Sequence, residues 1–215
     1  MTGERLLHSK YPFRKLLRYI PKRFSNLQEW QVSQNDTIYL FKNGQNTPSL
    51  LQRFAEVVES IVKENDGQWV ITFIPPSWGR EEEYDLRYGQ LTDYLRNHTG
   101  VPVITYGVML KDDTTVTSKH KDGIRTVMDG NIVVTSSSFN GKSVILIDDV
   151  ITTGTTFRAV GDALIAAGAV RIQGLMLAMT IHPNLPVKER QKGSYNSKSS
   201  TAISTAVNKP PQKPR

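Results

Sequence analysis

The chain has 215 residues, of which 38% are apolar, and it contains no cysteine. That length suits one domain with extensions and is enough to bury a core. The lack of cysteine excludes disulfides and thiolate zinc sites. No apolar run is long enough for a membrane span or a signal peptide, so we expect a soluble cytoplasmic protein.

The net charge of +7 is concentrated at the two ends of the chain. Residues 1–25 and residues 188–215 each carry +6, so that residues 26–187 sum to −5. A nucleic-acid-binding fold usually carries its basic patch on the folded body, whereas here the body is mildly acidic. Basic ends either keep a protein soluble or contact nucleic acid and other anionic partners, and both interpretations stay open.

Apolar runs alternate with helical patterns along the middle of the chain. Apolar residues at helical spacing predict a helix over 48–64, and the run WVITFI before two prolines predicts a buried strand over 69–74. Further predicted elements are a helix over 86–97, strands over 101–110, 131–135, 144–147 and 172–179, and a helix over 155–167 ended by Gly168. This order predicts an α/β fold with a mainly parallel central sheet and helices on both faces.

Two segments break the alternation. Residues 111–130 are polar, lack an apolar period and lie between two predicted strands. A loop of that length is typical of a functional or disordered segment, and we interpret this one as a mobile lid beside a site. Residues 185–215 are rich in Ser, Thr, Asn, Lys and Pro, which is typical of a disordered tail.

The segment VILIDDVITTGTT (144–156) runs from a buried strand through two acids into a turn and a helix. Ligands of open α/β sheets bind at the carboxyl ends of strands, where Asp148 and Asp149 are expected. Adjacent carboxylates can accept hydrogen bonds from vicinal hydroxyls, and the pair attracts a divalent cation. Asp149 is therefore expected to face a ligand and not the core.

The turn after the acids has the composition of a phosphate site. Thr152, Thr153, Gly154, Thr155 and Thr156 bring hydroxyls and backbone N–H groups to a helix N-terminus, where the helix dipole favours an anion. The segment matches neither GxxxxGK[ST] nor GxGxxG. Two acids beside a phosphate site describe a ribose 5-phosphate. The alternative is a strand–turn–helix whose Asp and Thr residues only cap and turn the chain.

These thirteen residues resemble the signature of type I phosphoribosyltransferases, which bind phosphoribosyl pyrophosphate (PRPP). Within that family, IYLFKNGQ (38–45), ITFIPPSWGR…LRYGQLTDYL (71–95) and KHKDGIRTVMDGNIVV (119–134) are similar to stretches of ComF-like proteins. The chain lacks the cysteine zinc module that those proteins carry N-terminally, which puts a role in DNA uptake in doubt. The resemblance implies the type I phosphoribosyltransferase fold with a small hood.

The resemblance also implies roles for the residues of the signature. Asp148 and Asp149 would bind the ribose hydroxyls and, directly or through water, Mg²⁺. Residues 152–156 would hold the 5-phosphate. Together with Lys119, which lies in the stretch similar to the family's mobile loop, the two acids form the candidate catalytic set. As an exposed loop charge, Lys119 can equally well be without a role.

Pyrophosphate contacts are implied for Pro76, Ser77 and Arg125. Pro76 follows the strand predicted over 69–74, and two adjacent prolines can also simply terminate a strand. Arg80 and Arg87 lie near enough in the sequence to assist, and a solvated helix face explains them equally well.

The implied function is that of a pentosyltransferase of nucleotide metabolism. It would transfer the 5-phosphoribosyl group of PRPP to a nitrogen acceptor, with Mg²⁺ as cofactor and release of pyrophosphate. Thr152 stands where family members acting on hypoxanthine or guanine carry an extra Asp, which makes a 6-oxopurine acceptor less favoured.

The implied organisation has three parts: a basic segment and hood over 1–47, the PRPP-binding domain over 48–184 and the tail over 185–215. The acceptor would meet the hood together with Ile181 and His182. One alternative function is a PRPP-binding sensor or interaction protein without catalysis. Another is a nucleic-acid-associated protein acting through its basic ends. A homodimer is compatible with each of these functions.

Overall fold

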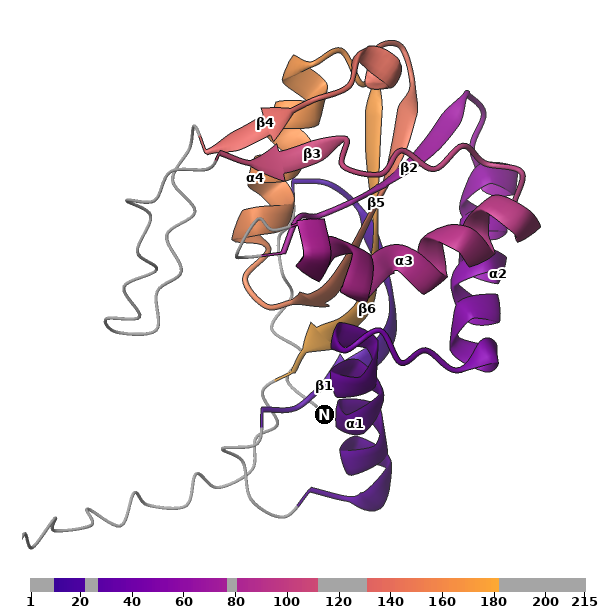
Figure 1. Ribbon diagram of the computed structural model, residues 1–215, viewed down its shortest axis with the longest axis vertical. Helices are drawn as coiled ribbons and strands as arrows, with labels where there is room; N and C mark the ends of the chain where they lie inside the picture. The colour runs from indigo at the N-terminus through magenta and orange to yellow at the C-terminus, as the bar shows by residue number, and fades with distance from the viewer. Residues whose placement is uncertain (1–9, 22–26, 77–80, 112–130, 182–215) are drawn as a thin grey trace, which may run out of the picture. The chain divides into compact units, whose positions relative to one another are not determined.

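The computed structural model describes residues 10–21, 27–76, 81–111 and 131–181 (Figure 1). The chain divides into two units, Met1–Leu185 and Pro186–Arg215, and all the described residues belong to the first. The predicted lid, apart from Lys111, and the predicted tail lie outside the described residues.

Four parallel strands form the central sheet in the order β1-β6-β5-β2, and β3 and β4 form a separate antiparallel pair. In chain order the elements are β1 (Phe13–Tyr19), α1 (Glu29–Lys42), α2 (Pro48–Glu64), β2 (Trp69–Phe73), α3 (Glu81–His98), β3 (Val108–Leu110), β4 (Ile132–Val134), a 3₁₀ turn (Ser137–Phe139), β5 (Ser143–Ile151), α4 (Thr155–Ala166) and β6 (Arg171–Thr180). The predicted α/β fold with a mainly parallel sheet is confirmed.

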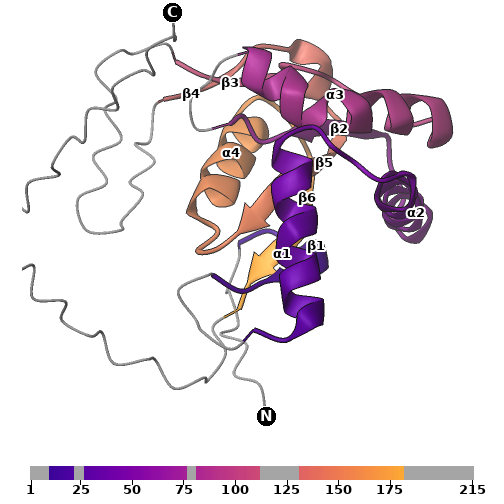
Figure 2. The same cartoon turned by 60° about the horizontal axis from the view of Figure 1, so that its bottom comes forward.

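Helices cover both faces of the sheet, and this explains why β2 and the first half of β5 are apolar on both sides. Ile145 and Ile147 of β5 belong to the core that α1, α2 and α3 complete, whereas Val144 and Leu146 belong to the core with α4. Figure 2 shows α4 to the left and α2 to the right of the strands. β5 pairs with both β2 and β6, so the strand that carries the two acids is central.

The N-terminal part of the first unit contributes to the sheet, which the sequence analysis did not anticipate. β1 pairs in parallel with β6 along its whole length. The buried Asn35 of α1 accepts a hydrogen bond from the N–H of Ile20 and donates one to its carbonyl oxygen, at 3.3 and 2.7 Å. Phe41 of α1 stacks on Phe54 of α2, with ring centroids 5.9 Å apart. These contacts anchor α1, whose last residue is Lys42, to the core that α1, α2 and α3 form on one face of the sheet.

The strand predicted over 101–110 is wrong in its first part. Only Val108–Leu110 is a strand, and Val103 forms a single parallel bridge with Ile71. Pro102 has no N–H to donate to a ladder, and Tyr106 takes a φ of 53°, which no strand residue adopts. The remaining predicted helices and strands are present, and α3 begins five residues before the predicted start.

Candidate functional site

The two acids lie inside β5 and not after it. The sequence predicts that this strand ends at residue 147, but β5 continues to Ile151 and pairs with β6 there. Asp148 and Asp149 are therefore held by the parallel sheet near its carboxyl end. The strand can continue because Val150 and Ile151 still find apolar neighbours, one in each core. The pairing of β5 with β6 therefore continues on both sides of the acid pair.

Asp149 is buried, with 7% of its surface exposed, and it meets two cations. Its Oδ2 lies 3.0 Å from a terminal guanidinium nitrogen of Arg87 on α3 and 3.3 Å from Nζ of Lys42 on α1. Its Oδ1 accepts a hydrogen bond from the N–H of Val150. The expectation that Asp149 faces only a ligand is therefore wrong, because its carboxylate also joins three elements of the core.

Asp148 is half-buried and contacts the hydroxyl of Tyr88 on α3, at 3.5 Å. Its Oδ1 accepts the N–H of Asp149 at 2.7 Å. Burial, followed by the negative charge of Asp149, raises the pKa of Asp148 to about 8. The end of β5 thus holds two different acids: Asp148 binds a proton readily, and Asp149 is paired with cations.

Tyr88 is fixed below the acids by the aromatic core. It stacks on Phe73 of β2, with ring centroids 4.6 Å apart, and its hydroxyl donates to the carbonyl oxygen of Ile74 at 3.0 Å. Burial, and then the charges of the two acids, raise the pKa of Tyr88. Its neighbour Arg87 therefore leaves α3 from a well-anchored turn, and the solvated helix face considered for Arg87 is wrong.

The turn between β5 and α4 presents its hydroxyls outward. Gly154 is the N-cap of α4 and has a φ of 76°, the left-handed conformation that glycine adopts without cost. Thr152, Thr153 and Thr155 are exposed and Thr156 is half-buried. The Thr152 hydroxyl contacts that of Thr180 at the end of β6, 2.8 Å away. This bond fixes the start of the turn to the neighbouring strand.

The start of α4 offers backbone donors that no carbonyl of the helix accepts, although the N–H of Thr155 lies 3.5 Å from the hydroxyl oxygen of Thr153. The helix's first intrahelical bond runs from the N–H of Arg158 to the carbonyl oxygen of Gly154, at 2.9 Å. The N–H groups that precede Arg158 in the helix have no intrahelical acceptor, and Gly154 supplies no capping side chain. The predicted positions of Val144–Ile147 in a central strand and of Thr155 at a helix start are both confirmed. The arrangement suits an anion with several acceptor oxygens.

Magnesium is compatible with the acid pair only as an ion held mainly by other ligands. Among the described residues there is no group of three or more His, Asp, Glu or Cys side chains that surrounds a metal position. Mg²⁺ commonly binds proteins through one or two carboxylates and completes its six ligands with water and phosphate oxygens. Asp148 and Asp149 fit that donor set.

The remaining candidate residues are only partly described. Pro76 is buried just after β2. Ser77, Lys119 and Arg125 lie outside the described residues, as do Arg80 and His182, so their predicted roles stay predictions. The sequence analysis missed Lys42 and Tyr88. Lys42 stands in the stretch IYLFKNGQ and Tyr88 follows Arg87 in LRYGQ, so both were within quoted motifs whose chemistry was not considered.

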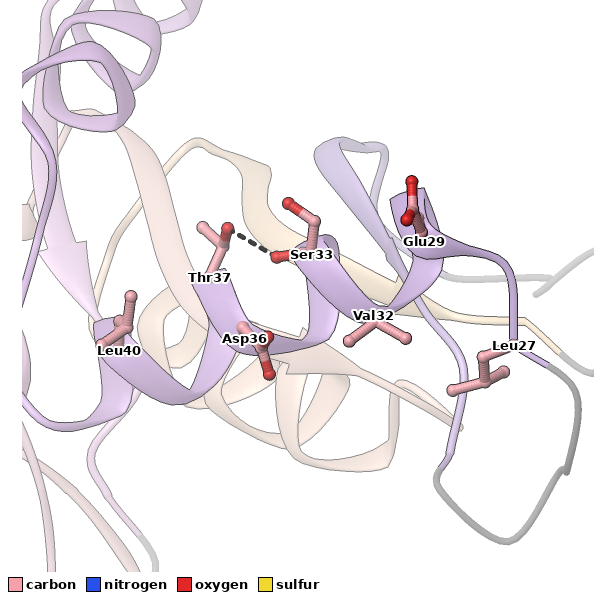
Figure 3. Close-up of a pocket in the computed structure, with 7 residues that line it drawn as sticks. All are labelled: Leu27, Glu29, Val32, Ser33, Asp36, Thr37 and Leu40. Atoms are coloured by element: carbon pink, nitrogen blue, oxygen red, sulfur yellow. Dashed lines mark hydrogen bonds between the residues drawn. The ribbon is translucent and has the colours of Figure 1, made fainter.

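A groove of about 440 Å³ lies along α1, and neither Asp148 nor Asp149 lines it (Figure 3). Its described lining residues are Leu27, Glu29, Val32, Ser33, Asp36, Thr37 and Leu40. Glu29 and Asp36 are the only ionisable side chains among them, and both repel a phosphate. The groove is therefore a poor site for an anionic ligand, and the end of β5 is the better candidate.

The described part of the chain contains no helix that is both long and apolar enough to cross a membrane.

Comparison with known families identifies a match to the phosphoribosyl transferase domain over residues 101–208, half of the chain. The matched range includes β5, the turn and α4.

Three bacterial proteins named bifunctional protein PyrR are similar to short parts of the chain. The protein from Actinobacillus pleuropneumoniae serotype 5b is 43% identical over 70 residues, which are 32% of this chain and 36% of that protein. That from Haemophilus ducreyi is 40% identical over 79 residues, 36% and 40% of the two chains. That from Bacillus mycoides is 38% identical over 81 residues, 37% and 42% of the two chains. The chain thus spans less than half the length of these curated relatives.

Two solved structures are similar at low identity. A hypoxanthine-guanine phosphoribosyltransferase from Bacillus anthracis aligns with a TM-score of 0.38 and 16% identity, over 60% of this chain and 68% of that one. A purine phosphoribosyltransferase from Pyrococcus horikoshii aligns with a TM-score of 0.35 and 20% identity, over 62% and 75%.

Proposed function

Because the chain belongs to the phosphoribosyl transferase domain family, we propose that it transfers the 5-phosphoribosyl group of PRPP to a nitrogen acceptor and releases pyrophosphate. This reaction would make the protein a pentosyltransferase. We also propose that Mg²⁺ is the cofactor of this reaction. The observation that carries the proposal is the continuous strand–turn–helix from Asp148 to Thr156, in which an acid pair is followed by a left-handed glycine and an exposed helix N-terminus.

In this proposal the two halves of the strand–turn–helix bind different parts of the ligand. The N–H groups at the start of α4 and the hydroxyls of Thr153 and Thr155 hold the 5-phosphate by charge-assisted hydrogen bonds. The carboxylates of Asp148 and Asp149 accept hydrogen bonds from the ribose hydroxyls. Because the strand backbone on one side and the Thr152–Thr180 bond on the other are fixed, the sugar is held in one orientation.

The reaction breaks the bond between the anomeric carbon and the pyrophosphate oxygen. The lone pair of the acceptor nitrogen forms the new bond to that carbon, and the nitrogen then loses its proton to solvent. The electron pair of the broken bond leaves with pyrophosphate. Bound Mg²⁺ would neutralise charge on that leaving group. The protein's own contribution is positioning and electrostatic stabilisation of a sugar that becomes cationic in the transition state, next to Asp148 and Asp149.

The test is a panel of nucleobases and amines incubated with the protein, PRPP and Mg²⁺, scored by acceptor-dependent release of pyrophosphate. We expect release with at least one acceptor and none with Asp149→Asn. Binding of PRPP without release for any acceptor would instead favour the non-catalytic sensor. If PRPP does not bind at all, the proposal is wrong.

Binding itself is measured by the unfolding midpoint. At one hundred times its dissociation constant, a ligand adds about 2.7 kcal/mol to the free energy of unfolding. For a chain of this size that corresponds to a shift of roughly 5–10 °C. ADP should give much less, because it does not present a 5-phosphate and a 1-pyrophosphate on one ribose. A PRPP shift no larger than that of pyrophosphate alone would contradict ribose recognition.

Within the family we propose a ComF-like member. The support is the sequence likeness over 38–45 and 71–95, two stretches that contain Lys42, Arg87 and Tyr88. All three residues lie around the acid pair in this structure. A role of these residues in the reaction would give that likeness a chemical meaning.

A further inference from the structure

The helix α1 carries apolar side chains on two opposite sides. Ile38 and Phe41 are buried in the core, whereas Val32 and Leu40 on the outer side are 44% and 40% exposed. Seven large apolar side chains are exposed among the described residues, and four of them lie on this helix: Trp30, Val32, Tyr39 and Leu40. A helix that is apolar all round is usually buried all round. The outer side of α1 therefore has the composition of a contact surface.

The groove along α1 described above combines apolar and acidic side chains (Figure 3). Its apolar lining comes from Leu27, Val32 and Leu40, and its charges are the carboxylates of Glu29 and Asp36. Both acids are exposed, and no Lys or Arg of the described residues forms an ion pair with either of them. We call this the acidic groove. It suits an apolar surface that is flanked by positive charge.

A second groove, of about 220 Å³, lies between α1 and the edge strand β1. It is lined by Lys15, Leu16, Leu17, Arg18, Trp30 and Gln34. We call it the basic groove, because Lys15 and Arg18 are the ionisable side chains of this lining. Gln34 fixes the helix against the strand here, since its side-chain oxygen accepts the N–H of Arg18 at 2.8 Å. Trp30 is 43% exposed, and tryptophan is a residue that interfaces favour.

The two grooves are adjacent and opposite in charge. Ser33 and Thr37 line the acidic groove, and Trp30 and Gln34, which lie within one helical turn of them, line the basic groove. Because both grooves open outward on neighbouring flanks of one helix, they cannot contact each other within one molecule. A second copy of the chain can present its basic groove to the acidic one. In an isologous dimer the same patch serves both copies, so this contact forms twice.

The charge pattern also selects the orientation of the two copies. A twofold axis parallel to α1 turns each flank of the helix toward the opposite flank of its copy. An axis in the interface and perpendicular to α1 would instead bring equal flanks together, and like charges across an interface repel. The first arrangement pairs each acidic groove with a basic one. A nucleic acid fits this surface less well, because Glu29 and Asp36 would repel its phosphates.

We propose that the chain forms a homodimer in which the acidic groove of each copy contacts the basic groove of the other, with the exposed apolar side chains of α1 between these contacts. The inference goes beyond the proposed function and does not depend on it, because none of the residues that line the grooves is assigned to PRPP. The interface and the acid pair share one helix, since Lys42 at the last residue of α1 contacts Asp149.

The test is the self-association of the full chain, measured by sedimentation equilibrium over a range of protein concentrations. Trp30→Ala removes the exposed aromatic side chain. Asp36→Arg reverses a charge in the acidic groove and Arg18→Glu reverses one in the basic groove. These two charge variants are measured separately and as an equal mixture. Because both lie at exposed positions, they decide the question even where Trp30→Ala does not fold.

Matched controls make the same kinds of change on other surfaces. Val170→Ala shortens an apolar side chain that is 65% exposed. Asp93→Arg and Arg53→Glu reverse charges at exposed positions of α3 and α2. All three controls should associate like the unmodified protein, because none of them lines either groove.

We expect the unmodified chain to dimerise, and each of the three groove variants to raise the dissociation constant about tenfold or more. The equal mixture of Asp36→Arg and Arg18→Glu should associate like the unmodified protein. In that heterodimer each reversed charge meets a reversed charge of the other variant, so that opposite signs face each other again. Added salt should weaken the association of the unmodified chain, because exposed charges are screened.

Three results would overturn the inference. A chain that stays monomeric at every concentration has no such interface. A dimer that none of the groove variants weakens is formed by another surface. A mixture that associates no better than its two components shows that the grooves do not face each other. A monomer that binds a single-stranded oligonucleotide through Arg18 would assign the basic groove to nucleic acid and would equally contradict the dimer.

Discussion

The acid corner, which consists of Asp148 and Asp149, and the turn from Thr152 to Thr155 are neighbours in the sequence but are built in different ways. Asp148 and Asp149 lie in a parallel strand, one of them is buried, and their charged or hydroxyl partners come from α1 and α3. The turn from Thr152 to Thr155 has exposed threonines, and apart from the bond of Thr152 to Thr180 it is shaped by contacts among its own residues and by the conformation of Gly154. Substitutions in the corner should therefore change stability and binding together, whereas those in the turn should change mainly binding.

The largest expected effect is that of Asp149→Asn. It removes the charge that pairs with Arg87 and Lys42, and it leaves Arg87 half-buried without a carboxylate. Breaking a buried ion pair from one side costs several kcal/mol, and because both cations reach solvent we expect a loss of about 2–3 kcal/mol. Urea unfolding measures it. Asp66→Asn, at an exposed loop position, is the control and should be neutral. Equal stability of the two variants would remove the contrast between corner and turn.

Asp148→Asn should have the opposite sign, and its size should depend on pH. The pKa of Asp148 is raised, so between about pH 4 and pH 8 the folded protein holds a proton that the unfolded chain has released. The free energy of unfolding therefore falls as the pH rises through that window. The amide cannot ionise and avoids this cost. We expect the variant to be more stable by roughly 2 kcal/mol above pH 8, with the difference decreasing toward pH 4.

Unfolding curves of both proteins at pH 5 and pH 8.5 test this. A pH-independent difference would mean that Asp148 does not titrate in the window. Asp149→Asn at the same two pH values is the companion measurement, because removing the neighbouring charge should also lower the pKa of Asp148.

Gly154→Ala tests the turn and should cost about 1 kcal/mol, because an L-residue with a Cβ is strained at a φ of 76°. Asn tolerates this conformation better, so Gly154→Asn should recover part of the loss. Thermal unfolding of both variants measures the difference. Identical midpoints for the alanine variant and the unmodified protein would show that the turn relaxes freely.

Thr153→Val should have the smallest effect on stability. The hydroxyl is exposed and contacts that of Thr155 at 3.0 Å, so we expect a change of less than about 0.5 kcal/mol in the free energy of unfolding. The midpoint shift with PRPP should shrink, because one donor to the 5-phosphate is lost. A large loss of stability without ligand would show that the turn is built from long-range contacts like the corner.

Much of this fold was predictable because its signals are local. A stripe of apolar residues at helical spacing predicts α2 within one residue at each end, and WVITFI before two prolines predicts β2. The failure at residues 101–107 has a local cause as well. Apolar side chains at Val101 and Val103 are buried, but Pro102 and the left-handed Tyr106 prevent a continuous strand.

The sequence by itself determined the strand, the acid pair, the glycine and the helix start, because each depends on residue types within one short segment. Only the tertiary structure decided what surrounds the acids. Lys42 and Arg87 reach Asp149 because α1 is anchored through Asn35 and α3 through its buried tyrosines. Contacts between residues far apart in the chain depend on how helices pack on the sheet. No local pattern of residue types encodes that packing. The packing of the helices on the sheet placed the two cations beside Asp149, and the burial that it produced raised the pKa of Asp148.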